Sequence, residues 1–451
     1  MSPKGIVGAA ACRRGREAPD AGLYNASVSP RIRAGLTLAL VWSLAACGPT
    51  PTPAAPTATA APIVPPTLTA SPGPTATPSP LVLRVWLPPA FAPDPQSEAG
   101  ALLQARLEAF EADHPEVRVE IRLKDEAGSA GLLGTLQAAA RVAPAALPDV
   151  LALDSSDLAQ AATAGQLAAL PPLPAEPETG VFDFTRRAVD VGGTRYGTPF
   201  GSRADVLVFR TDAFSRAPRS WSDLLSSTPP FLFPAGDPEG QITLAEYLSL
   251  GASLTDDRGQ LRLDSLNLEE VLAFYGSAHS AGLLPLTVRQ YESPLETWGA
   301  FHEGRATSAV APLHVFLAEG RSNELAAPLP TRDGDGVCLA MTWSWALVTQ
   351  DTARQPLALE LMTWLSAPAF LGEWTQALGL LPADHESLNA WSDGADKALA
   401  EQLISVTQAM PTAGVRAAVG APIRSAVDSV LSGQLTPNAA ALAAAQAVPP
   451  P

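Results

Sequence analysis

The sequence contains few cysteines, few lysines and few charged residues. Of its 451 residues only Cys12, Cys47 and Cys338 are cysteines, which excludes a scaffold held by disulfides, and no pair has zinc-site spacing. Charged residues make up 16% and apolar residues 47%, so disorder of the whole chain is excluded. The formal net charge is −16 and lysine occurs only at Lys4, Lys124 and Lys397. No basic stripe is visible, so we expect no nucleic-acid partner.

Motifs of catalysis and cofactor binding are missing as well. The chain has no G-x-S-x-G, H-E-x-x-H, Walker A or dinucleotide-binding glycine motif, and its five histidines have no metal-ligand spacing. Asp333-Gly334-Asp335-Gly336 resembles a fragment of a calcium loop, but the later ligands are missing, which indicates a plain acidic turn. We therefore expect no cofactor, no metal and no enzyme activity.

The first 46 residues are interpreted as a secretory signal, with a start site that we hypothesise to be over-extended. Arg31 and Arg33 precede an apolar run, residues 34–46, which is too short to span a bilayer. The run ends in Leu44-Ala45-Ala46-Cys47-Gly48, which looks like a bacterial lipobox with Cys47 as the lipidated first residue. The alternative is a buried helix that happens to contain one cysteine. The lipobox favours a protein anchored by lipid to the outer face of the cell membrane.

Residues 47–80 are predicted to be a spacer. Between Gly48 and Pro80 the chain has 11 prolines and 8 threonines in 33 residues. Proline fixes φ and removes a hydrogen-bond donor, so neither helix nor sheet is expected. The spacer would hold a folded body away from the membrane. That body is acidic, since the chain from Cys47 onward carries 23 basic and 43 acidic residues.

The body alternates strand and helix patterns, which predicts an α/β fold with largely parallel strands. A helix over 158–164 is expected to be capped by Ser155 or Ser156. Strands are expected at 81–87, 117–123, 149–153, 204–210 and 340–349, with a hairpin-like turn at 192–197. Further helices are expected at 101–112, 132–142, 244–250, 267–281, 294–303, 356–365, 369–378 and 396–410.

Several stretches in this order resemble the family 1 extracellular solute-binding proteins of ABC importers, the sugar-binding type. The stretches are Phe110 to Val119, Pro148 to Leu151, Tyr196 to Gly201, Val206 to Phe214, Arg219 to Leu224 and Trp298 to Ala306. The resemblance covers nearly all of residues 83 to 440. It implies two α/β lobes with several hinge crossovers, closing over a small-molecule ligand without chemistry. It also implies delivery to an ABC permease with its ATPase, by a protein that we expect to be a monomer.

Carried over from that family, lobe one would comprise residues 81–200 and 327–382. Lobe two would comprise residues 201–326 and 383–440, and residues 441–451 would form a tail. The crossings would fall near Gly201, near Pro328 to Pro330 and near Leu381.

Aromatic platforms and polar groups that pair with hydroxyls are the side chains that a sugar needs. Trp343 and Trp345 lie two apart in a predicted strand and so face one side. The family often presents an aromatic to the cleft at Trp343, whereas a core role is the alternative for both. Trp86 lies beside a loop that lines the cleft in relatives, and core and cleft are both open for it.

Polar candidates follow predicted strands or crossovers. Ser155 and Ser156 come directly after a strand, where ligands gather in α/β folds, although a helix cap is the alternative. Arg203 lies at the first crossover, where relatives place ligand-contacting groups; a surface arginine is the alternative. Phe233 and Asp237 lie in a loop that reaches the ligand in relatives, and His314 follows a strand. An ordinary packed turn and a surface histidine are the alternatives for these.

The sequence departs from the maltose-type pattern around Gly420-Ala421-Pro422, where a lobe-two tryptophan has no counterpart. That departure argues against a long oligosaccharide and leaves a smaller sugar or a polyol phosphate open. A secreted glycoside hydrolase, which needs two carboxylates, is one competing function. A surface scaffold protein is the other, since the spacer and anchor fit it equally well.

Overall fold

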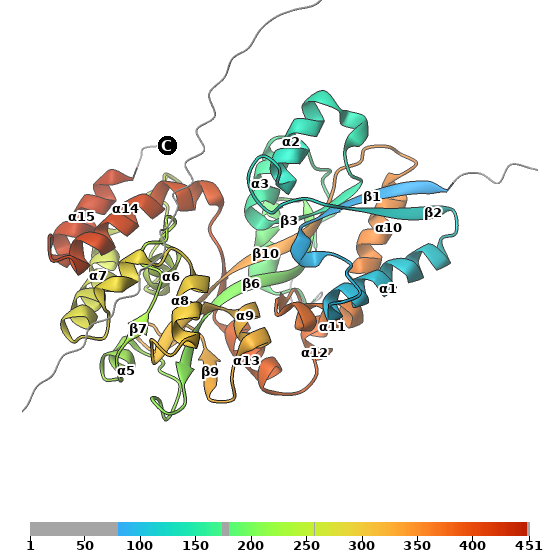
Figure 1. The fold of residues 1–451 in the computed structure, drawn as a ribbon. Helices are drawn as coiled ribbons and strands as arrows, with labels where there is room; N and C mark the ends of the chain where they lie inside the picture. Colours follow the sequence, from blue (N-terminus) through green and yellow to red (C-terminus); the bar gives the residue numbers. More distant parts are fainter. Residues whose placement is uncertain (1–79, 174–179, 257, 449–451) are drawn as a thin grey trace, which may run out of the picture. The chain divides into compact units, whose positions relative to one another are not determined.

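The computed structural model describes residues 80–173, 180–256 and 258–448. The expected signal sequence, Cys47 and the spacer up to residue 79 lie outside these described residues. Within them the chain forms one ten-stranded sheet, a two-stranded hairpin and helices that pack on the sheet (Figure 1). No helix in this part of the chain combines the length and apolar character needed to cross a membrane.

The large sheet has the strand order β2-β1-β3-β10-β6-β8-β7, with β9 and β11 also paired to β6 and β12 paired to β10. The strands are β1 Leu81–Leu87, β2 Val117–Leu123, β3 Val150–Asp154, β6 Gly197–Arg210, β7 Phe231–Leu232, β8 Ser308–Pro312, β9 Glu324–Ala327, β10 Cys338–Leu347, β11 Leu381–Pro382 and β12 Thr407–Ala409. The hairpin consists of β4 Asp190–Val191 and β5 Thr194–Arg195, around the turn expected from the glycines.

The sheet is mixed, whereas the sequence pattern predicted largely parallel strands. Strands β2, β1 and β3 are parallel, but β10 runs antiparallel to both β3 and β6. Strand β6 is likewise antiparallel to β8 and β9. Alternation of strand and helix in the first third of the chain predicts only local crossovers. Between β3 and β10 the chain follows a long path, and β10 then runs in the direction opposite to β3. No local sequence pattern predicts this reversal.

Most helices agree with the expected ranges. They are α1 Glu98–Asp113, α2 Leu132–Val142, α3 Ser155–Thr163, α4 Asp183–Ala188, α5 Trp221–Leu225, α6 Gln241–Ser249, α7 Ser265–Ser280, α8 Pro294–His302, α9 Leu313–Glu319, α10 Gln355–Leu365, α11 Pro368–Leu378, α12 His385–Asn389, α13 Ala395–Ser405, α14 Ala413–Leu431 and α15 Pro437–Ala447; three-residue to five-residue 3₁₀ turns lie at Pro89–Phe91, Pro144–Ala146 and Leu286–Gln290.

Three local expectations were wrong. The cap of α3 is Asp154, whose carboxylate accepts from the backbone N–H groups of Ser156 and Asp157, so neither serine is the cap. The helix expected over 396–410 ends at residue 405, because residues 407–409 pair with β10 instead. Residues 437–447 form a helix in which Ala440, Ala441 and Ala444 are buried, although a tail was expected from residue 441.

Two separate clusters of buried apolar side chains hold this part of the chain together. One cluster is built by β1, β2, β3, α1, α2, α3, α10 and α11. The other is built by β7, β8 and α5 to α8 together with α13 to α15. Strands β6 and β10 contribute to both: Phe200 and Trp343 lie in the first cluster, whereas Val206 and Ala340 lie in the second. These two strands therefore join the clusters.

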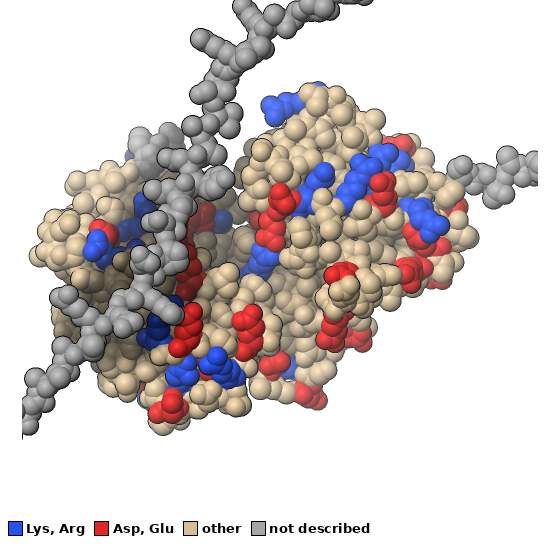
Figure 2. Space-filling model, viewed as in Figure 1, with Lys and Arg blue, Asp and Glu red and all other residues tan. Residues whose placement is uncertain are grey.

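Charged side chains of both signs are interspersed on the face shown in Figure 2. Many form exposed ion pairs, for example Arg187 with Asp183 and Arg305 with Glu303. Exposed pairs of this kind contribute little to stability. The stability of the fold therefore rests on the two buried clusters.

Candidate functional site

The carboxyl ends of β1, β2 and β3 lie at one edge of the sheet, because the three strands are parallel. The segments that follow them therefore meet there. Strand β2 is followed by Lys124, Asp125 and Glu126, and β3 is followed by the first turn of α3. At this end of the sheet β10 lies between β3 and β6, since Trp343 is paired with Asp154 on β3 and with Gly201 on β6. We call this point, where the three strands are paired through Trp343, the crossing.

Trp343 and Arg203 lie together at this crossing. The guanidinium carbon of Arg203 is 5.2 Å from the centroid of the Trp343 ring, a cation–π arrangement. The same guanidinium binds Glu126 through two hydrogen bonds of 2.6 and 2.7 Å. Trp343 is 2% exposed, and its indole Nε1 has no hydrogen-bond partner among the described residues. An indole N–H without a partner is costly when buried, and it can donate to a hydroxyl oxygen.

Ser156 is held by an arginine that comes from a distant helix. The Nη1 atom of Arg416, on α14, donates to Ser156 Oγ at 3.0 Å and to the Pro411 carbonyl at 2.6 Å. The Nε atom of the same side chain donates to Glu239 Oε2 at 2.7 Å. Arg416 is 6% exposed, so its charge is shielded from water. Ser155 is also buried, and its hydroxyl group makes no hydrogen bond within the described part of the chain.

Carboxyl groups around Arg416 have raised pKa values. Burial, followed by the charge of Asp154, raises the pKa of Asp157 to about 7, and Arg416 opposes the shift. Burial, followed by the charge of Asp237, raises the pKa of Asp205 to about 7. The pKa of Asp237 is raised chiefly by burial as well. A carboxyl group that titrates near neutral pH can both donate and accept a hydrogen bond.

Other expected site residues lie further from this group. Trp345 is fully buried and stacks on Trp374 with ring centroids 6.0 Å apart, which favours its core alternative. Phe233 is buried and stacks on Tyr275 at 4.7 Å, also inside the core. Trp86 is buried as well, with the Lys124 ammonium 5.2 Å from its ring.

His314 lies near Arg203, whereas Asp237 lies near Arg416. His314 lies at the start of α9, and partial burial of its imidazole, followed by the charge of Arg203, lowers its pKa, with Glu126 acting in the opposite direction. Both Arg203 and Glu126 therefore act on the imidazole. The carboxylate of Asp237 accepts from the backbone N–H groups of Glu239 and Gln241, at 2.9 and 2.8 Å. Asp237 thereby orders the loop that carries Glu239.

Sequence reasoning missed Glu126 and Arg416. Glu126 could have been found, because it follows a parallel strand just as Ser155 does. Arg416 carries a weaker signal: it is the one charged residue between Ala413 and Ile423, an otherwise apolar helical stretch. A lone charge on such a stretch has to find a buried partner. The sequence does not say which partner.

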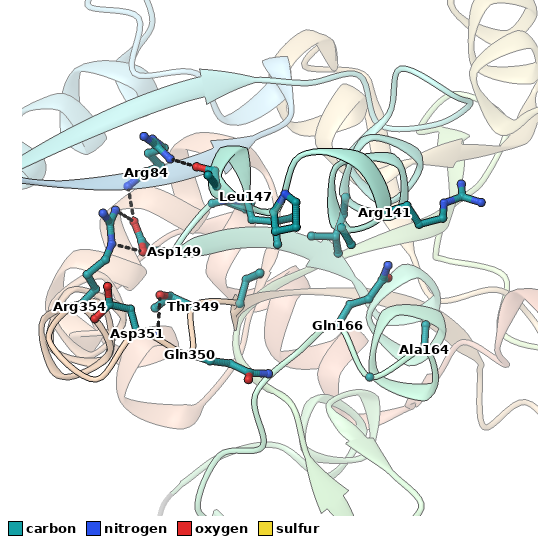
Figure 3. A pocket seen from close by; sticks show the side chains of 17 residues that line it. Arg84, Arg141, Leu147, Asp149, Ala164, Gln166, Thr349, Gln350, Asp351 and Arg354 are labelled. Atoms are coloured by element: carbon teal, nitrogen blue, oxygen red, sulfur yellow. Dashed lines mark hydrogen bonds and ion pairs between the residues drawn. The ribbon is translucent and has the colours of Figure 1, made fainter.

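A cavity among the described residues lies elsewhere. It has a volume of about 750 Å³ and is lined by residues around the amino end of β3, including Arg84, Asp149, Gln166 and Arg354 (Figure 3). Buried Asp149 accepts from the Arg84 backbone N–H at 2.8 Å and from Arg354 Nε at 2.8 Å, so these groups brace the strand ends. A five-residue strand is about 16 Å long. The cavity is thus separated by the length of β3 from Ser155 and contains none of the expected site residues.

The arrangement at the crossing holds no cluster of metal-ligating side chains. Groups of three or more His, Cys, Asp or Glu side chains placed to hold a metal ion do not occur among the described residues. Cys338 is buried, and burial raises the pKa of its thiol to about 12, so it does not act as a nucleophile.

Comparison with known proteins gives the class to which this fold and site belong. The family described as bacterial extracellular solute-binding protein matches residues 105–401, and the chain belongs to this family. The resemblance inferred from the sequence is therefore confirmed. No curated protein sequence matches the chain.

Solved structures of sugar-binding proteins share the fold at low sequence identity. MalE from Xanthomonas citri has a TM-score of 0.68 and 18% identity, over 81% of this chain and 96% of its own. The cyclic alpha-maltosyl-1,6-maltose binding protein from Arthrobacter globiformis has a TM-score of 0.67 and 20% identity, over 82% and 98%. MalE from Listeria monocytogenes, in complex with maltose, has a TM-score of 0.66 and 18% identity, over 81% and 96%. The expected two-lobed α/β fold of periplasmic binding proteins is confirmed.

Proposed function

We propose that the chain is an extracytoplasmic substrate-binding protein that captures a small carbohydrate and carries out no chemistry on it. The observation that supports this proposal best is the Trp343, Arg203 and Glu126 group at the crossing of β3, β10 and β6. It combines an indole with a charged pair that can bind hydroxyl groups. The relatives named above are sugar-binding proteins, which supports the same ligand class.

The ligand site is proposed to include the expected polar residues and the two that the structure adds. We propose that Ser155, Ser156, Asp237 and His314 belong to one site, together with Glu126 and Arg416. Trp86 stays in the proposal as a neighbour of Lys124. Phe233 and Trp345 would act indirectly, by supporting the loop and the strand that carry the site.

A small ligand is favoured by the packing of α14. A side chain at Gly420 would begin 2.5 Å from the carbonyl oxygen of Pro238 and 2.6 Å from the Cα atom of Glu239. The loop therefore packs directly on this helix, and no aromatic side chain can stand at residue 420. This explains why the tryptophan of maltose-type relatives has no counterpart here. We infer that the ligand is a mono- or disaccharide rather than a long oligosaccharide.

Delivery of the ligand would require partners that the chain itself does not contain. We propose an ABC permease with its ATPase as the recipient, and attachment to the outer face of the cell membrane through lipid on Cys47. The lobes are proposed as residues 81–200 with 327–382 and residues 201–326 with 383–440, acting as a monomer that closes on its ligand. The division of buried side chains between two clusters supports two moving bodies.

A panel of mono- and disaccharides and polyol phosphates tests the proposal. We expect one class to raise the unfolding temperature and to give a calorimetric binding signal, while chromatography finds the sugar unchanged. Trp343→Phe keeps an aromatic ring but removes the indole N–H, so it should weaken that binding by about 1 kcal/mol. Trp374→Phe, on α11, is the matched control, because it also removes a buried indole N–H that has no partner among the described residues, and unchanged affinity is expected. Release of a cleaved product would instead identify a glycoside hydrolase, and no binding across the panel would refute the carbohydrate assignment.

A further inference from the structure

Arg416 connects two elements that belong to different buried clusters. Helix α14 packs on α7 and α15, and its residues Val419 and Ile423 lie in the cluster around β7 and β8. Ser156 lies on α3, which packs on β3 and β10 in the other cluster. The hydrogen bond between Arg416 and Ser156 joins residues 260 positions apart in the chain.

Besides its bond to Ser156, Arg416 is held in place by two further hydrogen bonds. Its Nε donates to Glu239, and its Nη1 donates to the Pro411 carbonyl as well as to Ser156. Glu239 is itself placed by the packing of its loop on Gly420. The guanidinium is therefore pre-oriented, and among the described residues it also donates to the Ser156 hydroxyl on α3.

We propose that Arg416, held by Glu239 and bonded to Ser156, is a clasp that stabilises the closed arrangement of the two lobes in the absence of ligand. This inference rests on the proposed function, in which the lobes move relative to each other. A hydrogen bond from a charged donor, largely shielded from water, is stronger than one between neutral groups. Opening would exchange this bond for hydrogen bonds to water, and a hydrogen bond to a charged group is net favourable, so the clasp biases the equilibrium towards the closed form.

The clasp has a consequence for how ligand is captured. Because the bond joins the two lobes, it would favour a closed form over the open form, whether ligand is bound or not. A ligand enters only the open form, so the clasp slows entry. The same contact then retains the bound ligand, because release also requires opening. Arg416 and Ser156 would thus regulate the exchange of ligand at the proposed site.

Distance measurements on the ligand-free protein test the clasp. Spin labels are placed at Val142→Cys, which is 83% exposed on α2, and at Leu442→Cys on α15, in a full chain with Cys12→Ser and Cys47→Ser. Cys338 is buried with a raised pKa and so remains unlabelled. Pulsed electron resonance should show a short-distance population. Ser156→Ala should lower the ratio of short to long distances roughly tenfold or more.

Matched variants separate the clasp from other effects. Ser155→Ala removes the neighbouring hydroxyl, which has no partner, and should leave the distances unchanged; Ser156→Thr retains a hydroxyl and should restore the short population. Alanine is well tolerated in a helix, so Ser156→Ala should fold. Equal distance distributions in the wild type and Ser156→Ala, or the same shift in Ser155→Ala, would overturn the clasp. The measurement uses no ligand, so a negative sugar panel and a negative clasp result are distinguishable.

Discussion

Glu246 is a carboxyl group placed inside an apolar cluster. It lies on α6, is 5% exposed, and accepts a hydrogen bond of 2.8 Å from Trp221 Nε1. Burial raises its pKa to about 8, and the bond from Trp221 opposes this only in part. Between the unfolded pKa near 4.5 and the folded pKa the native state holds a proton that the unfolded state has released. Stability therefore falls as the pH rises through this window and levels off above it.

Replacing Glu246 by Gln should remove this pH dependence. The amide keeps an oxygen for Trp221 but cannot ionise. We expect Glu246→Gln to exceed the wild type in unfolding free energy at pH 8 by an amount on the order of 1–4 kcal/mol, and to lose that advantage towards pH 4. Denaturant titrations at several pH values measure the difference. Glu373→Gln, on the exposed side of α11, is the control. An advantage that stays constant across the pH range would contradict the explanation.

At the residue scale, the sequence predicted positions better than contacts. Ser156 and Arg203 could be named because residues after parallel strands and at crossovers gather at one edge. Their partners Arg416 and Glu126 could not be paired with them, since 260 and 77 residues separate the members of each pair. Burial was equally hidden: nothing in the spacing of Trp343 and Trp345 shows that both are buried in the first cluster, or that Trp343 is the one beside Arg203.

Helices α11 and α12 approach each other closely because residue 372 is a glycine. A Cβ atom there would lie 2.5 Å from the Cβ of Ala390 and 2.6 Å from the carbonyl oxygen of Ser387. Alanine is the better helix former by about 1 kcal/mol, so propensity alone predicts that Gly372→Ala stabilises the protein. The contact predicts the opposite, a loss of about 1–3 kcal/mol, because backbone has to move.

Gly299 provides the matched test of this contrast. It lies in helix α8, and a Cβ atom there would meet nothing within 4 Å. Gly299→Ala should therefore stabilise the protein by a few tenths to about 1 kcal/mol. Thermal and denaturant unfolding of the two variants measure both signs. If Gly372→Ala also stabilised the protein, the close packing of α11 on α12 would not limit that position.

At the scale of elements, periodicity predicted most helices and the first strands within a few residues, because each is a local pattern of apolar side chains. The predictions that failed depend on contacts with residues that are far away in the sequence. Residues 407–409 have a helical pattern but form a strand, because they pair in parallel with the first residues of β10. The direction of β10 follows from the route of the chain after β9. Helices α14 and α15 are rich in alanine, whose weak periodicity conceals a buried face.

For the molecule as a whole, two cores raise the question of whether they unfold separately. Independent lobes often give two transitions, because each has its own apolar cluster. Here strands β6 and β10 each place side chains in both clusters, for example Phe200 and Val206 on β6. Unfolding one cluster would release those strands and expose residues of the other. The shared strands should therefore couple the two cores.

We accordingly expect a single calorimetric transition whose calorimetric and van't Hoff enthalpies agree. Leu153→Ala on β3 and Leu268→Ala on α7 each remove a fully buried side chain, one from each cluster. Each should cost about 2–5 kcal/mol, the usual range for such a substitution. Because the strands are shared, both variants should lower the midpoint of the same transition without splitting it. A second peak in either variant would show that β6 and β10 connect the lobes without coupling their stability, and the two cores would then behave as separate domains.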